Sequence, residues 1–281
     1  MGSSWSDVND DSASEDGRDD ALRWEGNHYH PTASDVDVVR DGLIRLGLPT
    51  ELALYILDLA EYWVREVLCE RAVTLSVTAS GSPKNSSTWC YLASPPLARR
   101  PKKIRFYILS HDQGWGGPVE CQGTFRGSFS WTEVALMRPR RATFDSEKQR
   151  PQPPTRSMSW VRTSAQENSF VENTSDDPND IALDDPHYEA VSIDGRTHAA
   201  LQYNRVAVKH SERHVVEWRE DDEGGARRWG ERSEETGAGY GGGFVRAIEE
   251  GDRIAVFARA QYPGWANHVE GVRMEIFTSR Y

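Results

Sequence analysis

The chain has 281 residues and a formal net charge of −11, with 44 acidic against 33 basic side chains. An acidic excess of this size argues against nonspecific binding to nucleic acid or to an anionic membrane surface, because both need a basic footprint. Hydrophobic residues make up 37% of the chain and the mean hydropathy is −0.68, so we expect a good share of the residues to lie outside any core.

The N-terminal segment, residues 1–33, is rich in Ser, Asp and Gly, a composition typical of a disordered acidic tail. Its first six residues fit the M-G-x-x-x-S pattern for myristoylation at Gly2, but stable anchoring needs a second signal, and the sequence shows none. No stretch reaches the ~20 apolar residues of a membrane span, and no apolar signal region opens the chain. We therefore expect a cytoplasmic or nuclear protein without stable membrane insertion.

Residues 34–68 are predicted to form a helical hairpin. Apolar residues recur at helical spacing between 35 and 47, and Gly47 can end that helix. A second helix is predicted to start with Thr50 as its N-cap, and its apolar residues fall on one stripe. These residues are Leu52, Tyr55, Ile56, Leu59 and Trp63. Such a stripe either packs on the rest of the chain or binds a partner protein through Leu52, Tyr55, Ile56 and Leu59.

From about residue 72 the apolar period changes to two, which predicts strands with one dry face and one wet face. The clear strand signals cover 73–78, 104–108, 125–132, 253–259 and 272–276. Weaker signals cover 88–93, 187–193, 199–208, 213–219 and 243–248. Many short alternating strands without intervening helices predict a mostly β fold, an antiparallel β-sandwich or jelly roll, over residues 69–281. Proline-rich residues 138–186 are predicted to be a disordered insertion, and glycine-rich residues 220–242 a flexible loop.

Two segments that follow predicted strands contain the same kinds of residue. Residues 110–117 combine glycine-rich turns with a Trp, an amide and a His, and residues 261–268 combine a tight Pro-Gly turn with the same three. Loops at one end of a sandwich often hold ligands, and a Trp ring can stack on a sugar. The candidate ligand residues are His111, Asp112, Gln113, Trp115, Trp265, Asn267 and His268. The structural alternative is that the Trp rings cap the core while the polar side chains hold the turns.

Catalysis and metal binding are poorly supported. Ser110, His111 and Asp112 are adjacent, but adjacent residues on a strand point to opposite faces, and a triad is defined by geometry. The sequence shows no nucleophile elbow, zinc-protease motif or P-loop. His210 and His214 lie in a predicted strand, where their spacing does not make a chelate. The cysteines, which suit a reducing compartment and lack metal-ligand spacing, are Cys69, Cys90 and Cys121. We expect no cofactor and no metal.

Two stretches of the sequence resemble known families. The run Leu48-Pro49-Thr50-Glu51-Leu52, followed by Ile56-Leu57, resembles the first helix of an F-box, which implies docking to the linker protein of a ubiquitin ligase. The segment from Gly251 to Ile276, taken with Ser110 to Trp115, resembles a family of uncharacterised proteins from filamentous fungi. The end of this segment, in which a strand, a turn with a Trp and a second strand follow one another, is similar to galactose-binding-like jelly rolls. These include the sugar-binding domains of glycoprotein-recognising F-box proteins, in which a short helical module precedes the sandwich and the ligand loops lie at one end.

These observations leave three functions open. The first is a non-catalytic binding module that takes a carbohydrate or a peptide through the loops of Trp115 and Trp265. The second is an F-box-like adaptor for protein degradation that uses the N-terminal helices. The third is a hydrolase with His111 and Asp112 as acid and base.

Overall fold

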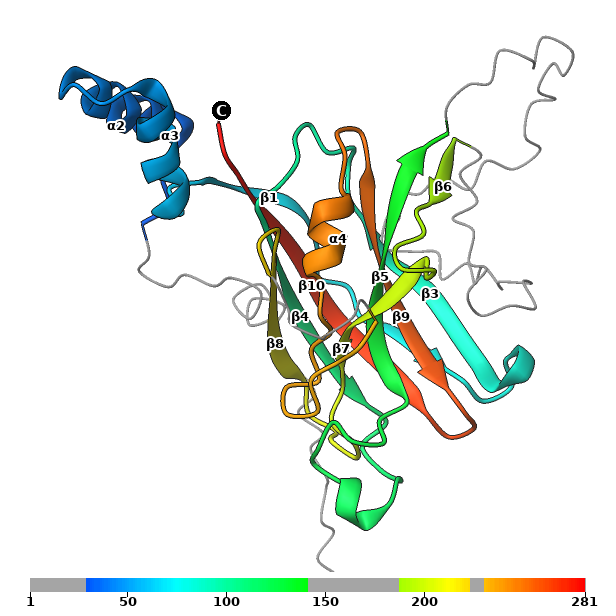
Figure 1. Cartoon of the computed structure of the whole chain (residues 1–281). Coiled ribbons are helices and arrows are strands. Elements are labelled where there is room, and N and C mark those ends of the chain that lie inside the picture. Colours follow the sequence, from blue (N-terminus) through cyan, green and yellow to red (C-terminus); the bar gives the residue numbers. More distant parts are fainter. Residues whose placement is uncertain (1–28, 141–186, 223–229, 281) are drawn as a thin grey trace, which may run out of the picture.

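A computed structural model describes residues 29–140, 187–222 and 230–280. Within these ranges the chain forms two antiparallel sheets packed face to face, preceded by two short helices (Figure 1). The mostly β sandwich predicted from the alternation is therefore confirmed. Gly2, most of the acidic tail, most of the 138–186 insertion and part of the 220–242 loop lie outside the described residues. None of the helices in the described ranges has the length and apolar character needed to cross a membrane.

The two N-terminal helices are α2 (Ala33–Arg45) and α3 (Thr50–Leu59). The side chain of Thr32 accepts a hydrogen bond from the Asp35 N–H, and the Asp35 carboxylate accepts one from the Thr32 N–H, which together form a capping box. Gly47, at a φ of +93°, follows the first helix as predicted. The prediction that Thr50 caps the second helix was wrong, because Pro49 occupies the cap position and Thr50 is already helical.

The helical hairpin is shorter than the predicted 34–68. Glu61 adopts a φ of +49° two residues after α3 ends, and strand β1 (Val64–Arg71) starts soon afterwards. Trp63 is buried and does not extend the exposed stripe of α3. The sequence around Val64 continues the helical spacing, but pairing of this strand with the C-terminal strand, Val64 opposite Thr278, overrides that local preference.

The first sheet, sheet A, has the strand order β1-β10-β4-β8, with β2 paired to the beginning of β10. Its other strands are β2 (Leu75–Thr78), β4 (Lys103–Asp112), β8 (Glu212–Arg219) and β10 (Ala266–Thr278). β10 is the longest strand and lies at the centre of the sheet, so residues at its two ends mark the two ends of the sandwich (Figure 1).

The second sheet, sheet B, has the order β3-β9-β5-β6, and β7 also pairs with β5. Its strands are β3 (Ser86–Ala93), β5 (Ser130–Pro139), β6 (Tyr188–Ala190), β7 (His198–Tyr203) and β9 (Arg253–Gln261). The weak strand signal at 243–248 was wrong, because residues Gly242–Ala247 form the short helix α4. This helix places Phe244 edge-on against the buried Trp218, with ring centroids 5.4 Å apart.

The core lies between the sheets, but β5 and β9 are buried on both faces rather than on one. The outward face of these strands carries Trp131, Glu133 and Arg259. The Glu133 carboxylate accepts hydrogen bonds from Arg259 Nη1 at 3.2 Å and from Trp131 Nε1 at 3.1 Å. A charged side chain tolerates burial when it is paired and hydrogen-bonded in this way. On β9 the alternation marked this face as solvated, through Arg259, because it does not show such pairing. On β5 it assigned the faces the wrong way round: Ser130 and Thr132 share the core-facing parity of Val134 and are buried, whereas Trp131 lies on the outward face.

Candidate functional site

The structure brings the two predicted ligand segments together at one end of the sandwich. In the register of β4 with β10, His111 lies opposite His268 and Asp112 lies opposite Asn267. The N–H of Ala266 donates to Gln113 Oε1 at 3.1 Å, which ties the segment after β4 to the beginning of β10.

Trp115 and Trp265 occupy different environments at this end. The Trp115 side chain is 63% exposed, whereas Trp265 is half-buried. The ring of Trp115 lies so close to Gly264 that a Cβ at position 264 would come within 3.4 Å of the indole. Phe129 packs edge-on against both Tyr262 and Trp265, at 4.6 and 5.4 Å between ring centroids. We call these four residues the aromatic tip: Trp115, Phe129, Tyr262 and Trp265.

Asp112 is fully buried and holds a loop. Its carboxylate accepts hydrogen bonds from the backbone N–H groups of Gly114 at 2.7 Å, Ala207 at 2.6 Å and Val208 at 2.9 Å. Burial raises the pKa of Asp112, although these three hydrogen bonds act in the opposite direction. With its oxygens engaged in this way, Asp112 supports the segment that carries Trp115 instead of facing solvent.

Asn267 is also fully buried and belongs to a polar network inside the sandwich. Its Nδ2 donates to the Trp131 carbonyl at 2.6 Å, and its Oδ1 accepts from Asn204 Nδ2 at 2.9 Å. Asn204 Oδ1 accepts in turn from the Ser110 hydroxyl at 2.7 Å. Ser110 thus points into the core while His111 lies on the outer face of sheet A. The adjacent Ser, His and Asp therefore form no triad.

His111 and His268 stack on each other, with ring centroids 4.6 Å apart and planes inclined by 15°. Nδ1 of His111 donates to the Asp112 carbonyl at 2.6 Å, and Nδ1 of His268 is hydrogen-bonded to the Ser76 hydroxyl at 2.8 Å. Burial, followed by repulsion from His111, lowers the pKa of His268. Lone pairs lie in the ring planes, so two nearly parallel rings are not arranged to share one metal ion. Across the described ranges no three His, Cys, Asp or Glu residues are placed to hold a metal.

The predicted partner-binding stripe of α3 is exposed. Leu52, Tyr55, Ile56 and Leu59 all face solvent, and Leu59 is 67% exposed. The buried side of this helix is formed by Ala53 and Leu57 instead. Together with Leu46, which follows α2 and is 82% exposed, the four stripe residues form what we call the hairpin face. The stripe is therefore not used to pack the helices on the sandwich.

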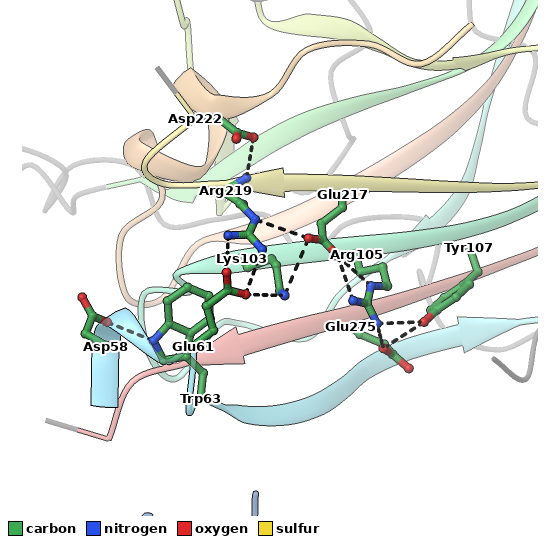
Figure 2. A network of polar contacts seen from close by, with 10 residues as sticks. All are labelled: Asp58, Glu61, Trp63, Lys103, Arg105, Tyr107, Glu217, Arg219, Asp222 and Glu275. Carbon is green, nitrogen blue, oxygen red and sulfur yellow. Dashed lines mark hydrogen bonds and ion pairs between the residues drawn. The ribbon is translucent and has the colours of Figure 1, made fainter. Parts of the chain in front are cut away.

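A network of charged side chains joins the hairpin to sheet A (Figure 2). Glu61 accepts hydrogen bonds from Arg219 Nη2 at 2.8 Å and from Lys103 Nζ at 3.3 Å, and the Arg219 contact is the main reason that the pKa of Glu61 is lowered. Trp63 Nε1 donates to Asp58 at 2.9 Å. Sequence reasoning missed this joint. Its one local signal is the pair of basic residues, Lys103 and Arg105, on one face of β4, and their acidic partners come from distant segments.

The outer face of sheet A continues the network toward Glu275 (Figure 2). Glu275 is fully buried and accepts two hydrogen bonds from Arg273, through Nε at 3.0 Å and Nη2 at 2.8 Å. Tyr107 donates its hydroxyl to the same carboxylate at 3.3 Å, and Arg105 lies 4.0 Å from it. Each charge in this part of the network has a partner, so its role is to hold strands and side chains in register.

The sequence matches no family model and no curated protein. Within the described residues, geometry marks two candidate surfaces: the aromatic tip at the beginning of β10, and the hairpin face at the other end of the same strand (Figure 1).

Proposed function

We propose that this chain is a non-catalytic binding module that recognises a carbohydrate or a peptide through the aromatic tip. The observation that carries this proposal is the exposure of Trp115 in a fixed position. The residue is 63% exposed, yet the edge of its indole lies beside Gly264, and Gln113 Nε2 holds its backbone by donating to the Trp115 carbonyl at 2.7 Å. An aromatic ring that is already held in place loses little entropy when a ligand stacks on it, which favours binding.

A carbohydrate suits this surface better than a peptide does. Trp115 and Tyr262 are both exposed and offer flat apolar faces, on which the C–H groups of a sugar ring can stack. His111 and His268 lie close to the same end and have ring nitrogens that can bond hydroxyl groups. The similarity of the C-terminal segment to galactose-binding-like jelly rolls supports the same reading.

A glycan array probed with the full chain tests this proposal. We expect binding of at least one glycan class, and Trp115→Ala should weaken it by about tenfold or more, as expected for an aromatic residue at the centre of a contact. Val119→Ala, which truncates another exposed apolar side chain near this end, serves as the matched control and should leave binding unchanged. Peptide binding with loss in Trp115→Ala would assign the tip to a peptide. Equal binding by both variants would refute the proposal.

The exposed hairpin face favours a second candidate function, that of an adaptor. Residues 33–61 contain six acidic and two basic side chains, so the partner that fits is an amphipathic helix whose apolar stripe is flanked by Lys or Arg. The resemblance of Leu48–Leu52 to an F-box helix supports the linker protein of a ubiquitin ligase as the partner. An F-box continues with further helices, however, whereas β1 begins here at Val64.

Two purified probes separate the adaptor readings: the ubiquitin-ligase linker protein, and a synthetic helix of Leu and Lys. Binding of the linker protein that is lost in Leu59→Asp would establish the F-box-like reading. Binding of the synthetic helix alone, with the same loss, would establish an adaptor for a different partner. If neither probe binds, or if Leu59→Asp binds as the unchanged chain does, the hairpin face is no docking surface. Val119→Asp is the control for an added surface charge.

A further inference from the structure

Charged side chains are distributed unevenly between the two ends of the sandwich. Four loops lie around the aromatic tip: residues 79–86, 113–129, 204–210 and 261–268. These loops contain four basic side chains and one acidic side chain, all of them exposed: Lys84, Arg126, Arg205 and Lys209, against Glu120. Residues 33–61, at the hairpin end, show the opposite balance, with six acidic and two basic side chains. The tip is therefore a basic surface on a chain whose net charge is −11.

Lys209 lies beside Trp115. Gly114, the residue before Trp115, has a φ of +83°, and a Cβ at this position would come within 2.7 Å of the Lys209 Cβ. Asp112 holds the two segments together, because its carboxylate accepts hydrogen bonds from the N–H groups of Gly114 and Val208. Lys209 is exposed and forms no ion pair with another residue in the described ranges. Its ammonium group can therefore bind an anionic group on a ligand that stacks on Trp115.

Lys84 lies beside Tyr262, the second exposed ring of the tip. It belongs to the short 3-10 turn η1 (Pro83–Asn85), which connects β2 to β3. The Tyr262 N–H donates to the Asn85 carbonyl at 2.8 Å, so this turn is fixed against the turn that carries Tyr262. Lys84 and Lys209 thus come from two different loops, and each supplies a positive charge next to one of the exposed rings.

We infer that the ligand of the aromatic tip is an acidic oligosaccharide, one whose sugar rings carry carboxylate or sulfate groups. Its rings stack on Trp115 and Tyr262, and its anionic groups bind Lys209 and Lys84. This inference rests on the proposed carbohydrate-binding function and specifies the class of its ligand. A neutral sugar could stack on the same rings, but it would gain nothing from the two ammonium groups. An anionic one forms charge-assisted hydrogen bonds with them and is attracted to this end by the local positive field.

A glycan array tests the inference when each sulfated, sialylated or uronic-acid glycan is paired with its uncharged counterpart and probed with the full chain. We expect the acidic member of a pair to bind at least about tenfold more tightly. The glycan pair with the largest difference is then titrated in solution. Lys84→Glu combined with Lys209→Glu should weaken binding of the acidic glycan by about tenfold or more and leave binding of the uncharged one unchanged. Trp115→Ala should weaken both.

The control is Arg45→Glu combined with Arg99→Glu, which makes the same change of charge at two exposed arginines of the hairpin end and should leave binding unchanged. Circular dichroism checks that all variants remain folded. If this control weakens binding as much as the lysine variant does, the net charge and not the tip is responsible, and the inference is overturned.

Other outcomes separate this inference from the function on which it rests. Equal binding of acidic and uncharged glycans, lost in Trp115→Ala, would overturn the inference and leave the carbohydrate-binding function intact. If no glycan binds, both are overturned. Vesicles of phosphatidylcholine and phosphatidylserine provide the last comparison. If they bind where the acidic glycans do not, and the lysine variant abolishes this binding, the tip recognises an anionic membrane surface instead.

Discussion

His214 on β8 makes the stability of this protein sensitive to mild acid. Its ring packs edge-on against Phe125, with centroids 6.1 Å apart, and its Nε2 is buried without a hydrogen-bond partner. Burial, assisted by repulsion from Arg205, lowers the pKa of His214 from 6.5 to about 4. Between these two values the unfolded chain binds a proton at this position and the folded chain does not, so stability increases with pH across the window and falls as pH decreases through it.

The size of the effect follows from the pKa difference. One pKa unit corresponds to about 1.4 kcal/mol, so lowering the pH from 7 to 5 should cost about 2 kcal/mol through His214, and about 3 kcal/mol by pH 4. His198 and His268, whose pKa values are also lowered mainly by burial, act in the same direction. A loss of 2 kcal/mol is a substantial part of the total stability of a typical domain.

Urea unfolding at pH 7 and pH 5 measures this loss. We expect His214→Gln, which keeps a similar shape but does not titrate, to lose about 2 kcal/mol less than the unchanged chain between the two pH values. Val119→Ala is the control, because it truncates an exposed apolar side chain, removes no titratable group and should leave the pH dependence unaltered. The same pH dependence in the unchanged chain and in His214→Gln would refute the reasoning.

Two further predictions concern the sandwich. Glu275→Gln removes the buried charge that compensates Arg273, and should lower the free energy of unfolding by about 3 kcal/mol in a denaturant titration; a change below about 0.5 kcal/mol would show that the pair contributes little. Gly241→Ala would bring a Cβ within 1.8 Å of the Trp218 ring, so the melting temperature should fall sharply. Gly42→Ala is its control, because that Cβ meets nothing within 4 Å in helix α2 and should add up to about 1 kcal/mol of stability, reversing the sign.

The sequence predicted the strands best where burial alternates cleanly. Ile104, Phe106 and Ile108 all face the core, and the same parity leads to Ser110 and Asp112. Extending this parity through the end of β4 would have identified both polar residues as buried, and His111 as outward-facing, without coordinates. No local sequence pattern shows which residues form hydrogen bonds with Ser110 and Asp112. Asn204 and the backbone of Ala207 and Val208 reach Asp112 and Ser110 only because the chain returns there some ninety residues later.

Strand β1 was missed for the same physical reason. Its residues pair with a strand more than two hundred positions away, and nothing between Leu59 and Val64 disrupts the helical spacing except the backbone of Glu61, which turns to a φ of +49°. That turn places the Glu61 carboxylate between Lys103 and Arg219, which are themselves opposite each other on β4 and β8. Long-range pairing thus decides both where the helix ends and how the hairpin is held.

The length of β10 has a consequence for the two proposed surfaces. The strand has 13 residues, with the aromatic tip at its beginning and the hairpin joined near its end. At about 3.4 Å per residue this separates the two surfaces by roughly 40 Å, which is more than the width of a sugar or a single helix. A ligand at the tip therefore leaves the hairpin face open to a partner. If both surfaces bind, the chain would link its tip ligand to that partner, and Trp115→Ala and Leu59→Asp should each abolish one interaction while leaving the other intact.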